Sequence, residues 1–171
     1  KLGYVLQDAD NQMFMPTVFE DMLFGPLNYG MPRPEAEALV DQTLAELNLT
    51  HLKNRRNHKL SGGEKRMAAI ATILAMQPQM LLMDEPFASL DFITRGELQA
   101  ELLDIQKELQ KTILLVTHQL DEALLLAQKI VVLHADSSVR VWELELPYPR
   151  DLTSPQLTAL REEITAECRK D

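Results

Sequence analysis

Two segments of the sequence combine residue types that can act on a phosphate group. Residues 61–63 are Ser-Gly-Gly, and two adjacent glycines at a helix start can turn backbone N–H groups toward an anion. Four apolar residues at 80–83 run into Asp84 and Glu85, a pattern typical of a buried strand that delivers two carboxylates to one edge of a sheet. Nucleotide hydrolysis needs a cation on the phosphates, a group that orients the attacking water, and donors for the phosphoryl charge. The two segments together supply candidates for these tasks.

The wording and order of three segments resemble the ATPase subunit of ABC transporters. Residues 60–66 (Leu-Ser-Gly-Gly-Glu-Lys-Arg) resemble the signature motif, and residues 80–86 (Met-Leu-Leu-Met-Asp-Glu-Pro) resemble the Walker B strand with its catalytic glutamate. Residues 89–91 (Ser-Leu-Asp) resemble the D-loop. Three matches in sequence order are a highly specific signal. The resemblance implies a P-loop NTPase-like α/β fold, with a parallel sheet and an α-helical subdomain.

One motif of that family does not occur among the 171 residues. None of the six glycines belongs to a Gly-x-x-x-x-Gly-Lys-Ser/Thr loop, the Walker A motif. Residues 1–7 look like the strand and glutamine that open the Q-loop, which follows Walker A in the family. We therefore expect the sequence to correspond to the C-terminal two-thirds of an ATPase domain. Alone, it is expected to bind MgATP very weakly, to lack ATPase activity and to be marginally stable.

Four residues are candidates for the nucleotide and metal site. Asp84 would hold Mg²⁺ through its water shell, and the adjacent Glu85 would polarise the attacking water. His118 follows a buried apolar strand and resembles the switch histidine, which contacts the γ-phosphate. Gln7 resembles the Q-loop glutamine, whose amide can accept a hydrogen bond from a metal-bound water. The structural alternatives are a solvated strand end for the carboxylates and a packing role for the histidine or the glutamine.

A second group of candidates would face another subunit. In the family two subunits meet head to tail, and the signature of one closes on the γ-phosphate held by the other. The resemblance therefore assigns Ser61, Gly62, Gly63, Glu64 and Asp91 to a nucleotide bound by a partner ATPase, in a homodimer or a heterodimer. The alternative for the glycines is an ordinary turn at a helix start.

The periodicity of the sequence indicates an α/β fold, because short apolar runs alternate with helical segments. The runs expected to form the parallel sheet are residues 2–6, 80–83, 113–116 and 130–133. A hairpin strand is expected at 139–146, and a final helix from Ser154 and Pro155. The capping-box form of residues 94–97 predicts that another helix starts there.

We interpret residues 1–171 as one partial ABC transporter ATPase domain with three parts. Residues 11–76 form an α-helical subdomain that includes the signature motif, and in it residues 67–76 are apolar on all sides and should form a buried helix. Residues 77–134 hold the Walker B, D-loop and switch-histidine core. Residues 135–171 form a C-terminal hairpin and helix.

Composition excludes several classes of protein. Seventeen basic and 26 acidic residues give a net charge of −9, which argues against general affinity for nucleic acid or anionic membranes. The longest apolar stretch, residues 67–76, is far shorter than the ~20 residues that cross a bilayer. The single Cys168 excludes an internal disulfide and suits a reducing cytoplasm.

The resemblance has two subfamily components. Residues 8–27 look like the Q-loop region of cobalt and energy-coupling-factor importers, where Met13, Phe14 and Phe24, if exposed, could line a groove for a partner's helix. Packing in the core is the alternative for these side chains. Two later segments, residues 85–91 and the tail at 145–155, look closer to nitrate, sulfonate and taurine importers.

The function implied by the resemblance is an ATP-binding and hydrolysing subunit of an ABC importer. It would use ATP and Mg²⁺, work with a second ATPase subunit and transmembrane permease subunits, and lie peripherally at the cytoplasmic face of the cell membrane. One alternative is a truncated, non-catalytic chain that donates signature and D-loop to an intact partner ATPase. Another is a soluble ABC-type ATPase of DNA repair or translation, against which the compact helical insert argues.

Overall fold

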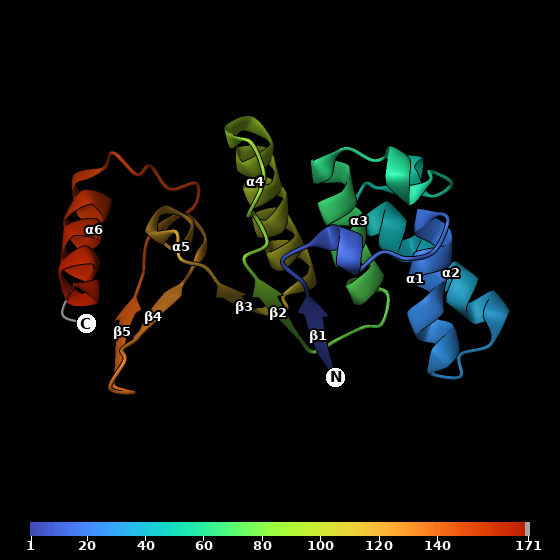
Figure 1. The fold of residues 1–171 in the computed structure, drawn as a ribbon, viewed down its shortest axis with the longest axis horizontal. Helices are drawn as coiled ribbons and strands as arrows, with labels where there is room; N and C mark the ends of the chain where they lie inside the picture. The colour runs from blue at the N-terminus through green and yellow to red at the C-terminus, as the bar shows by residue number, and fades with distance from the viewer. Residues whose placement is uncertain (170–171) are drawn as a thin grey trace. The chain divides into compact units, whose positions relative to one another are not determined.

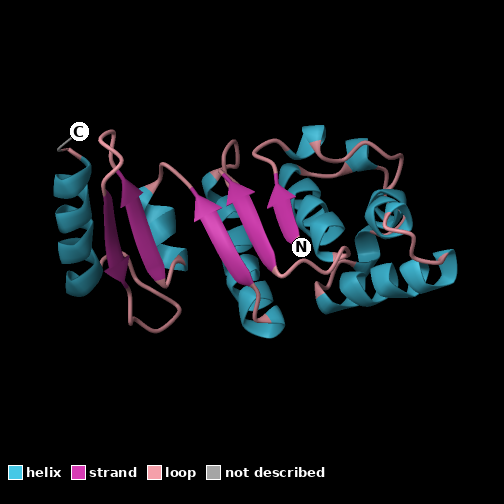
Figure 2. Ribbon diagram, turned by 90° about the horizontal axis from the view of Figure 1, so that it is seen from below, coloured by secondary structure: helices cyan, strands magenta, loops and turns pink. Residues whose placement is uncertain are grey.

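Three short apolar segments, far apart in the sequence, pair as parallel strands in the computed structural model, which describes residues 1–169 (Figure 1). They are β1 (Leu2–Val5), β2 (Met80–Asp84) and β3 (Thr112–Val116), and they lie side by side in that order (Figure 2). The expected parallel sheet of an α/β fold is thereby confirmed for these three segments.

The chain divides into two units by the contacts between its residues. The first unit comprises residues 1–116, and the second begins at Thr117. The three-part division made from the motifs follows sequence patterns rather than packing, and it stays a prediction.

Helices connect the strands of the first unit, and α3 is the central one. The helices are α1 (Val18–Asn28), α2 (Arg33–Glu46), α3 (Gly62–Leu74) and α4 (Phe92–Leu109), with 3₁₀ turns η1 (Ala9–Asn11), η2 (Thr50–Leu52) and η3 (Asn57–Lys59). Because α3 packs on α1, α2, α4 and β1, its residues 67–71 are all buried, as expected for the apolar segment at 67–76. Within residues 1–169, each helix is too short or too polar to cross a membrane.

The two faces of the three-stranded sheet differ in exposure. Val5, Leu81 and Met83 are fully buried on the face toward α3. On the opposite face apolar side chains are between 39% and 61% exposed, namely Leu2, Tyr4, Met80, Leu114 and Val116. Continuous apolar runs are typical of strands that are covered on both faces. Within the described residues, packing covers one face of this sheet and leaves the other face exposed.

One helix begins earlier than the sequence analysis predicted. The Thr-x-x-Glu pattern at residues 94–97 has the form of a capping box, but α4 already starts at Phe92. Asp91 is its N-cap and accepts hydrogen bonds from the backbone N–H groups of Ile93 and Thr94, both at 3.1 Å. An aspartate is a strong N-cap, so it takes that position and leaves Thr94 inside the first turn.

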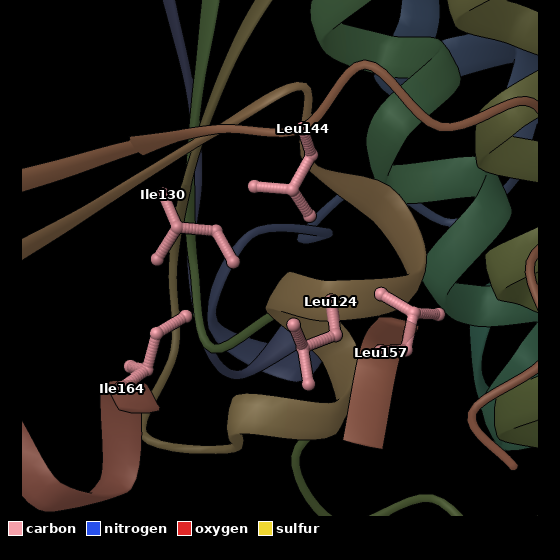
Figure 3. Close-up of a cluster of buried hydrophobic side chains, with 5 residues drawn as sticks. All are labelled: Leu124, Ile130, Leu144, Leu157 and Ile164. Carbon is pink, nitrogen blue, oxygen red and sulfur yellow. The ribbon is translucent and has the colours of Figure 1, made fainter. Parts of the chain in front are cut away.

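The second unit is a small α/β layer with its own core. Its elements are α5 (Leu120–Leu126), β4 (Lys129–Leu133), β5 (Val139–Glu143) and α6 (Pro155–Cys168). Leu124, Ile130, Leu144, Leu157 and Ile164 converge in a buried apolar cluster (Figure 3). The predicted final helix is confirmed, and Ser154 is its N-cap.

The strand at residues 129–133 is paired differently from the prediction. It was expected in the parallel sheet, but β4 pairs antiparallel with β5 in a separate two-stranded sheet. The connection is a tight turn in which the N–H of His134 donates to the carbonyl of Ser138 at 3.0 Å. A short turn can join only antiparallel neighbours, so the predicted hairpin is confirmed while the parallel pairing of β4 is wrong for the described residues.

Gly3 offers a test of how closely β1 and α3 approach. A Cβ atom at Gly3 would overlap Cγ2 of Ile73 in α3 and lie 2.9 Å from Cδ2 of Leu81. We expect Gly3→Ala to lower the free energy of unfolding by about 1–3 kcal/mol through overpacking. The matched control is Gly96→Ala in α4, where nothing lies within 4 Å of the added atom. It should raise the free energy by about 0.5–1 kcal/mol, and urea denaturation measures both changes.

Candidate functional site

Asp84 ends β2 and is oriented by a tyrosine from the neighbouring strand. The hydroxyl of Tyr4 donates to Oδ2 of Asp84 at 3.1 Å, and this bond raises the pKa of Tyr4. Tyr4 lies opposite Leu82 in the parallel register, so its side chain shares a face with Asp84, two positions further along β2. The carboxylate is half-buried, which leaves it open to solvent at the edge of the sheet.

Glu85 leaves the strand in an unusual backbone conformation. Its φ is +45°, in the left-handed region that residues other than glycine rarely adopt. Two features fix the turn. The N–H of Glu85 donates to the carbonyl of Val116 at 2.9 Å, and Phe87, two residues further on, is buried with an exposed fraction of 1%. The backbone therefore changes direction directly after Asp84, and the separate roles predicted for the two carboxylates stay a prediction.

Gln7 follows β1 at the same edge of the sheet. Since β1 and β2 are parallel neighbours, their carboxyl ends place Gln7 and Asp84 on one side of the first unit. The Gln7 side chain is exposed, and its backbone carbonyl accepts a hydrogen bond from Nη2 of the buried Arg66. The structure thus brings together two of the residues predicted to face a nucleotide and its metal.

The Ser-Gly-Gly turn at residues 61–63 begins α3 through a reciprocal capping box. Oγ of Ser61 accepts from the N–H of Glu64 at 3.2 Å, and the N–H of Ser61 donates to Oε2 of Glu64 at 2.7 Å. The second bond holds the pKa of Glu64 below its usual value. Ser61 and Gly62 are exposed, so the first turn presents N–H groups and the positive end of the helix dipole to solvent. This geometry can receive an anion.

The two glycines of the turn have different surroundings. A Cβ at Gly62 would make an ordinary contact with Leu90 at 3.5 Å, whereas a Cβ at Gly63 would lie 2.8 Å from Cγ2 of Thr94. Gly63 is therefore needed for the close packing of α3 on α4. The same approach brings residues 61–63 next to the segment that contains Asp91.

Asp91 is occupied by the first turn of α4. Besides its two backbone bonds, its Oδ2 accepts from the hydroxyl of Thr94 at 2.6 Å, and this bond lowers the pKa of Asp91. The carboxylate is exposed, but both of its oxygens accept hydrogen bonds from the first turn of α4. Its predicted role at a partner's nucleotide stays a prediction.

His118 lies in the second unit, in the bend between β3 and α5. The flanking Thr117 fixes this bend, because its hydroxyl donates to Oε2 of the buried Glu122 at 2.7 Å and accepts from the N–H of Gln119 at 3.1 Å. The His118 side chain is exposed. Its predicted role at the γ-phosphate stays a prediction.

Phe14 in the first loop and Phe24 in α1 are exposed, but Met13 is not. Met13 is 7% exposed, so the expectation of an exposed Met13 is wrong and the packing alternative holds for it. Phe14 and Phe24 are 63% and 40% exposed and meet edge to face with ring centroids 4.8 Å apart. The buried Asp21 supports the loop by accepting from the N–H groups of Phe14 and Met15 at 3.1 and 3.0 Å.

The oxygen donors at this edge of the sheet suit Mg²⁺ better than they suit a metal ion whose ligands all come from the protein. In residues 1–169 no group of three or more His, Cys, Asp and Glu side chains could hold a metal ion. Mg²⁺ is usually bound by one or two carboxylates together with waters and phosphate oxygens. The half-buried Asp84, with the exposed amide of Gln7 at the same edge, fits that requirement.

Comparison with known proteins gives a family match. The family model described as ABC transporter matches residues 1–88. The cobalt import ATP-binding protein CbiO of Rhodobacter capsulatus is 45% identical over 132 residues, which are 77% of this chain and 47% of that protein. The energy-coupling factor transporter ATP-binding protein EcfA of Methanocaldococcus jannaschii is 41% identical over 133 residues, 78% of this chain and 47% of that protein.

A solved structure agrees with these relatives. The chain resembles cbiO1 from Clostridium perfringens, described as part of the ABC transporter complex cbiONQ, with a TM-score of 0.71 and 39% identity. The similarity covers 76% of this chain and 52% of cbiO1. The chain thus spans about half the length of the relatives it matches. The fold class expected from the sequence is confirmed.

The close approach of α3 and α4 predicts a mutation pair with a specific rescue. Gly63→Ala should destabilise the first unit by about 1–3 kcal/mol, because the new methyl meets Cγ2 of Thr94. Thr94→Ser removes that Cγ2 atom and keeps the hydroxyl that binds Asp91. The double variant should therefore recover most of the loss, with a coupling of about 1 kcal/mol in a double-mutant cycle of unfolding. Additive losses would mean that Thr94 is not the obstacle.

Proposed function

Because this chain belongs to the ABC transporter ATP-binding family, we propose that it acts as the ATP-binding and hydrolysing subunit of an importer. The observation that carries the proposal is the pair at the end of β2, where Asp84 stays in line with the strand and Glu85 turns away from it at a φ of +45°. A residue kept in a rare backbone conformation at a strand end often marks a working site. The importer type that fits is that of the cobalt and energy-coupling-factor relatives.

In the proposed reaction each residue has one task. Asp84 would hold Mg²⁺, which neutralises charge on the phosphates when bound. Glu85 would orient the attacking water and accept its proton. The side chain of Gln7 would accept a hydrogen bond from water at the same edge of the sheet. His118 would approach the γ-phosphate and hold the geometry.

The Ser-Gly-Gly turn is proposed to serve a nucleotide held by a second ATPase subunit. The exposed hydroxyl of Ser61 and the N–H groups of Gly62 and Gly63 would donate to its γ-phosphate. Glu64 would keep the turn in shape through the capping box. Asp91 would act at the same interface by fixing the start of α4.

Further partners follow from the exposed surface. We propose that Phe14 and Phe24, a contacting and partly exposed aromatic pair, contact a helix of a transmembrane permease subunit at the cytoplasmic face of the membrane. The net charge of −9 argues against nucleic acid as a partner. The tail similarity to nitrate, sulfonate and taurine importers stays a prediction, and the proposal assigns no transported solute.

The alternative is a chain that donates its turn to an intact partner ATPase without hydrolysing ATP itself. The left-handed Glu85 favours the catalytic proposal, because a purely donating chain needs no strained residue at that position. The two proposals differ in one observable: only the catalytic subunit loses turnover when its own Glu85 is changed.

The first functional prediction concerns Glu85→Gln in the ATPase subunit that contains these residues. The amide keeps the shape of the side chain but cannot accept the proton of water, so ATPase activity should fall at least about 100-fold while ATP affinity is kept. Glu35→Gln on the exposed side of α2 is the matched control and should change neither. Phosphate release and calorimetry measure the two quantities. Near-normal turnover in Glu85→Gln would reject the catalytic assignment.

The second functional prediction concerns the turn. Gly62→Asp places a negative charge where a phosphate of the partner's nucleotide would lie, so ATP-dependent dimerisation should be lost while ATP binding by the single subunit stays intact. Ala38→Asp, also an exposed small residue in a helix of the first unit, is the control and should dimerise normally. Sedimentation velocity with MgATP distinguishes the outcomes. Unchanged dimerisation of Gly62→Asp would contradict the assignment of the turn.

A further inference from the structure

Arg66 is a buried charge that the proposed reaction does not use. It lies on α3 shortly after the Ser-Gly-Gly turn and is 4% exposed. Nη1 donates to the carbonyl of Leu6 at 2.6 Å, and Nη2 donates to the carbonyl of Gln7. Burial lowers the pKa of Arg66, but an arginine keeps its charge under these conditions.

The hydrogen bonds of Arg66 are directed at one short backbone segment. Burying a guanidinium is unfavourable unless its N–H groups are well paired, and here the terminal nitrogens pair with two successive backbone carbonyls. Nε is buried without a hydrogen-bond partner among the described residues. An apolar side chain would fill this place in the core at a lower desolvation cost. What the arginine adds is a planar fork that fixes the two peptide groups on either side of Gln7, Leu6–Gln7 and Gln7–Asp8.

Two further contacts attach the same segment to α3. Lys65, next to Arg66, forms an ion pair with Asp10. Nε2 of Gln12 donates to the carbonyl of Ala69 at 2.7 Å, and its Oε1 accepts from the N–H of Leu6 at 3.1 Å. Residues 6–12 are therefore bonded to three residues of α3, namely Lys65, Arg66 and Ala69.

We propose that Arg66 is a positioning residue that couples Gln7 to α3, so that Gln7 and the Ser-Gly-Gly turn keep a fixed relation to one another. This role rests on the proposed function, since Gln7 matters only where a nucleotide and its metal bind. Arg66 touches neither of them and acts through the backbone of Gln7. A movement of α3 is transmitted to Gln7 through two hydrogen bonds, one to each of the peptide groups that flank it.

The kinetic test is a double-mutant cycle in the ATPase subunit that contains these residues. Arg66→Met keeps length and removes all donors, while Arg66→Lys keeps the charge but loses the fork. Arg66→Met and Gln7→Ala should each lower kcat about tenfold, in the range expected when an outer residue that orients a site is lost. The double variant should be no slower than either single one, because both changes remove the same contribution. Arg66→Lys should lie between wild type and Arg66→Met.

The control variant changes another residue of α3. Thr72→Val removes a hydrogen bond that stays within α3, from its hydroxyl to the carbonyl of Ala68, and should leave kcat unchanged. An additive fall of about 100-fold in the Arg66→Met and Gln7→Ala double variant would overturn the proposal, because it would show that Arg66 acts independently of Gln7. An unchanged kcat in Arg66→Met would overturn it as well.

Hydrogen exchange tests whether Arg66 holds residues 7–12 in place, and this measurement does not require ATPase activity. In Arg66→Met the amides of residues 7–12 should exchange faster than in wild type and in Thr72→Val, while α3 keeps its protection. Unchanged exchange at 7–12, or loss of protection throughout α3, would overturn the positioning role. A wild-type subunit without ATPase activity would refute the proposed function alone, since the exchange data would still decide whether Arg66 holds this segment.

Discussion

Helix α3 is packed on two sides at once, and both contacts are so close that they require glycine. On one side Gly3 of β1 allows the helix to reach the sheet, because any Cβ there would overlap Ile73. On the other side Gly63 allows it to reach Thr94 at the start of α4. The position of the helix start relative to the end of β2 is fixed by these two contacts. The turn at residues 61–63 and the carboxylates that follow β2 therefore keep a fixed relation within the chain, although they are proposed to serve two different nucleotides.

Much of the candidate site could be predicted, since its residues lie in short continuous segments. The apolar run before Asp84 defines a strand by composition, and the pattern of Ser61 with Glu64 defines a helix start by local hydrogen bonds. Both signals involve residues at most a few positions apart. The structure confirms the strand and the helix start, and it adds a capping box between Ser61 and Glu64 that the sequence analysis did not identify.

The remaining residues could not be predicted, because they act over long separations. Tyr4 reaches Asp84 across 80 positions, and Arg66 reaches Leu6 across 60. No periodicity in the sequence marks such pairs. The start of α4 was misplaced for a different reason: two capping patterns overlap, and the aspartate at residue 91 precedes the threonine at 94. A closer ranking of N-cap residues would have found it.

The order of strands in the first sheet also has a consequence for synthesis of the chain. Leu2 pairs with Met80, and the whole helical segment lies between them. At a translation rate of about 5–20 residues per second, β1 waits for several seconds before its partner strand leaves the ribosome. During that time Val5, which ends fully buried, lacks Met83, the residue opposite it in β2. Closing so long a loop is slow in itself, so the apolar side chains of β1 lack the cover of β2 until residues 80–84 have been synthesised.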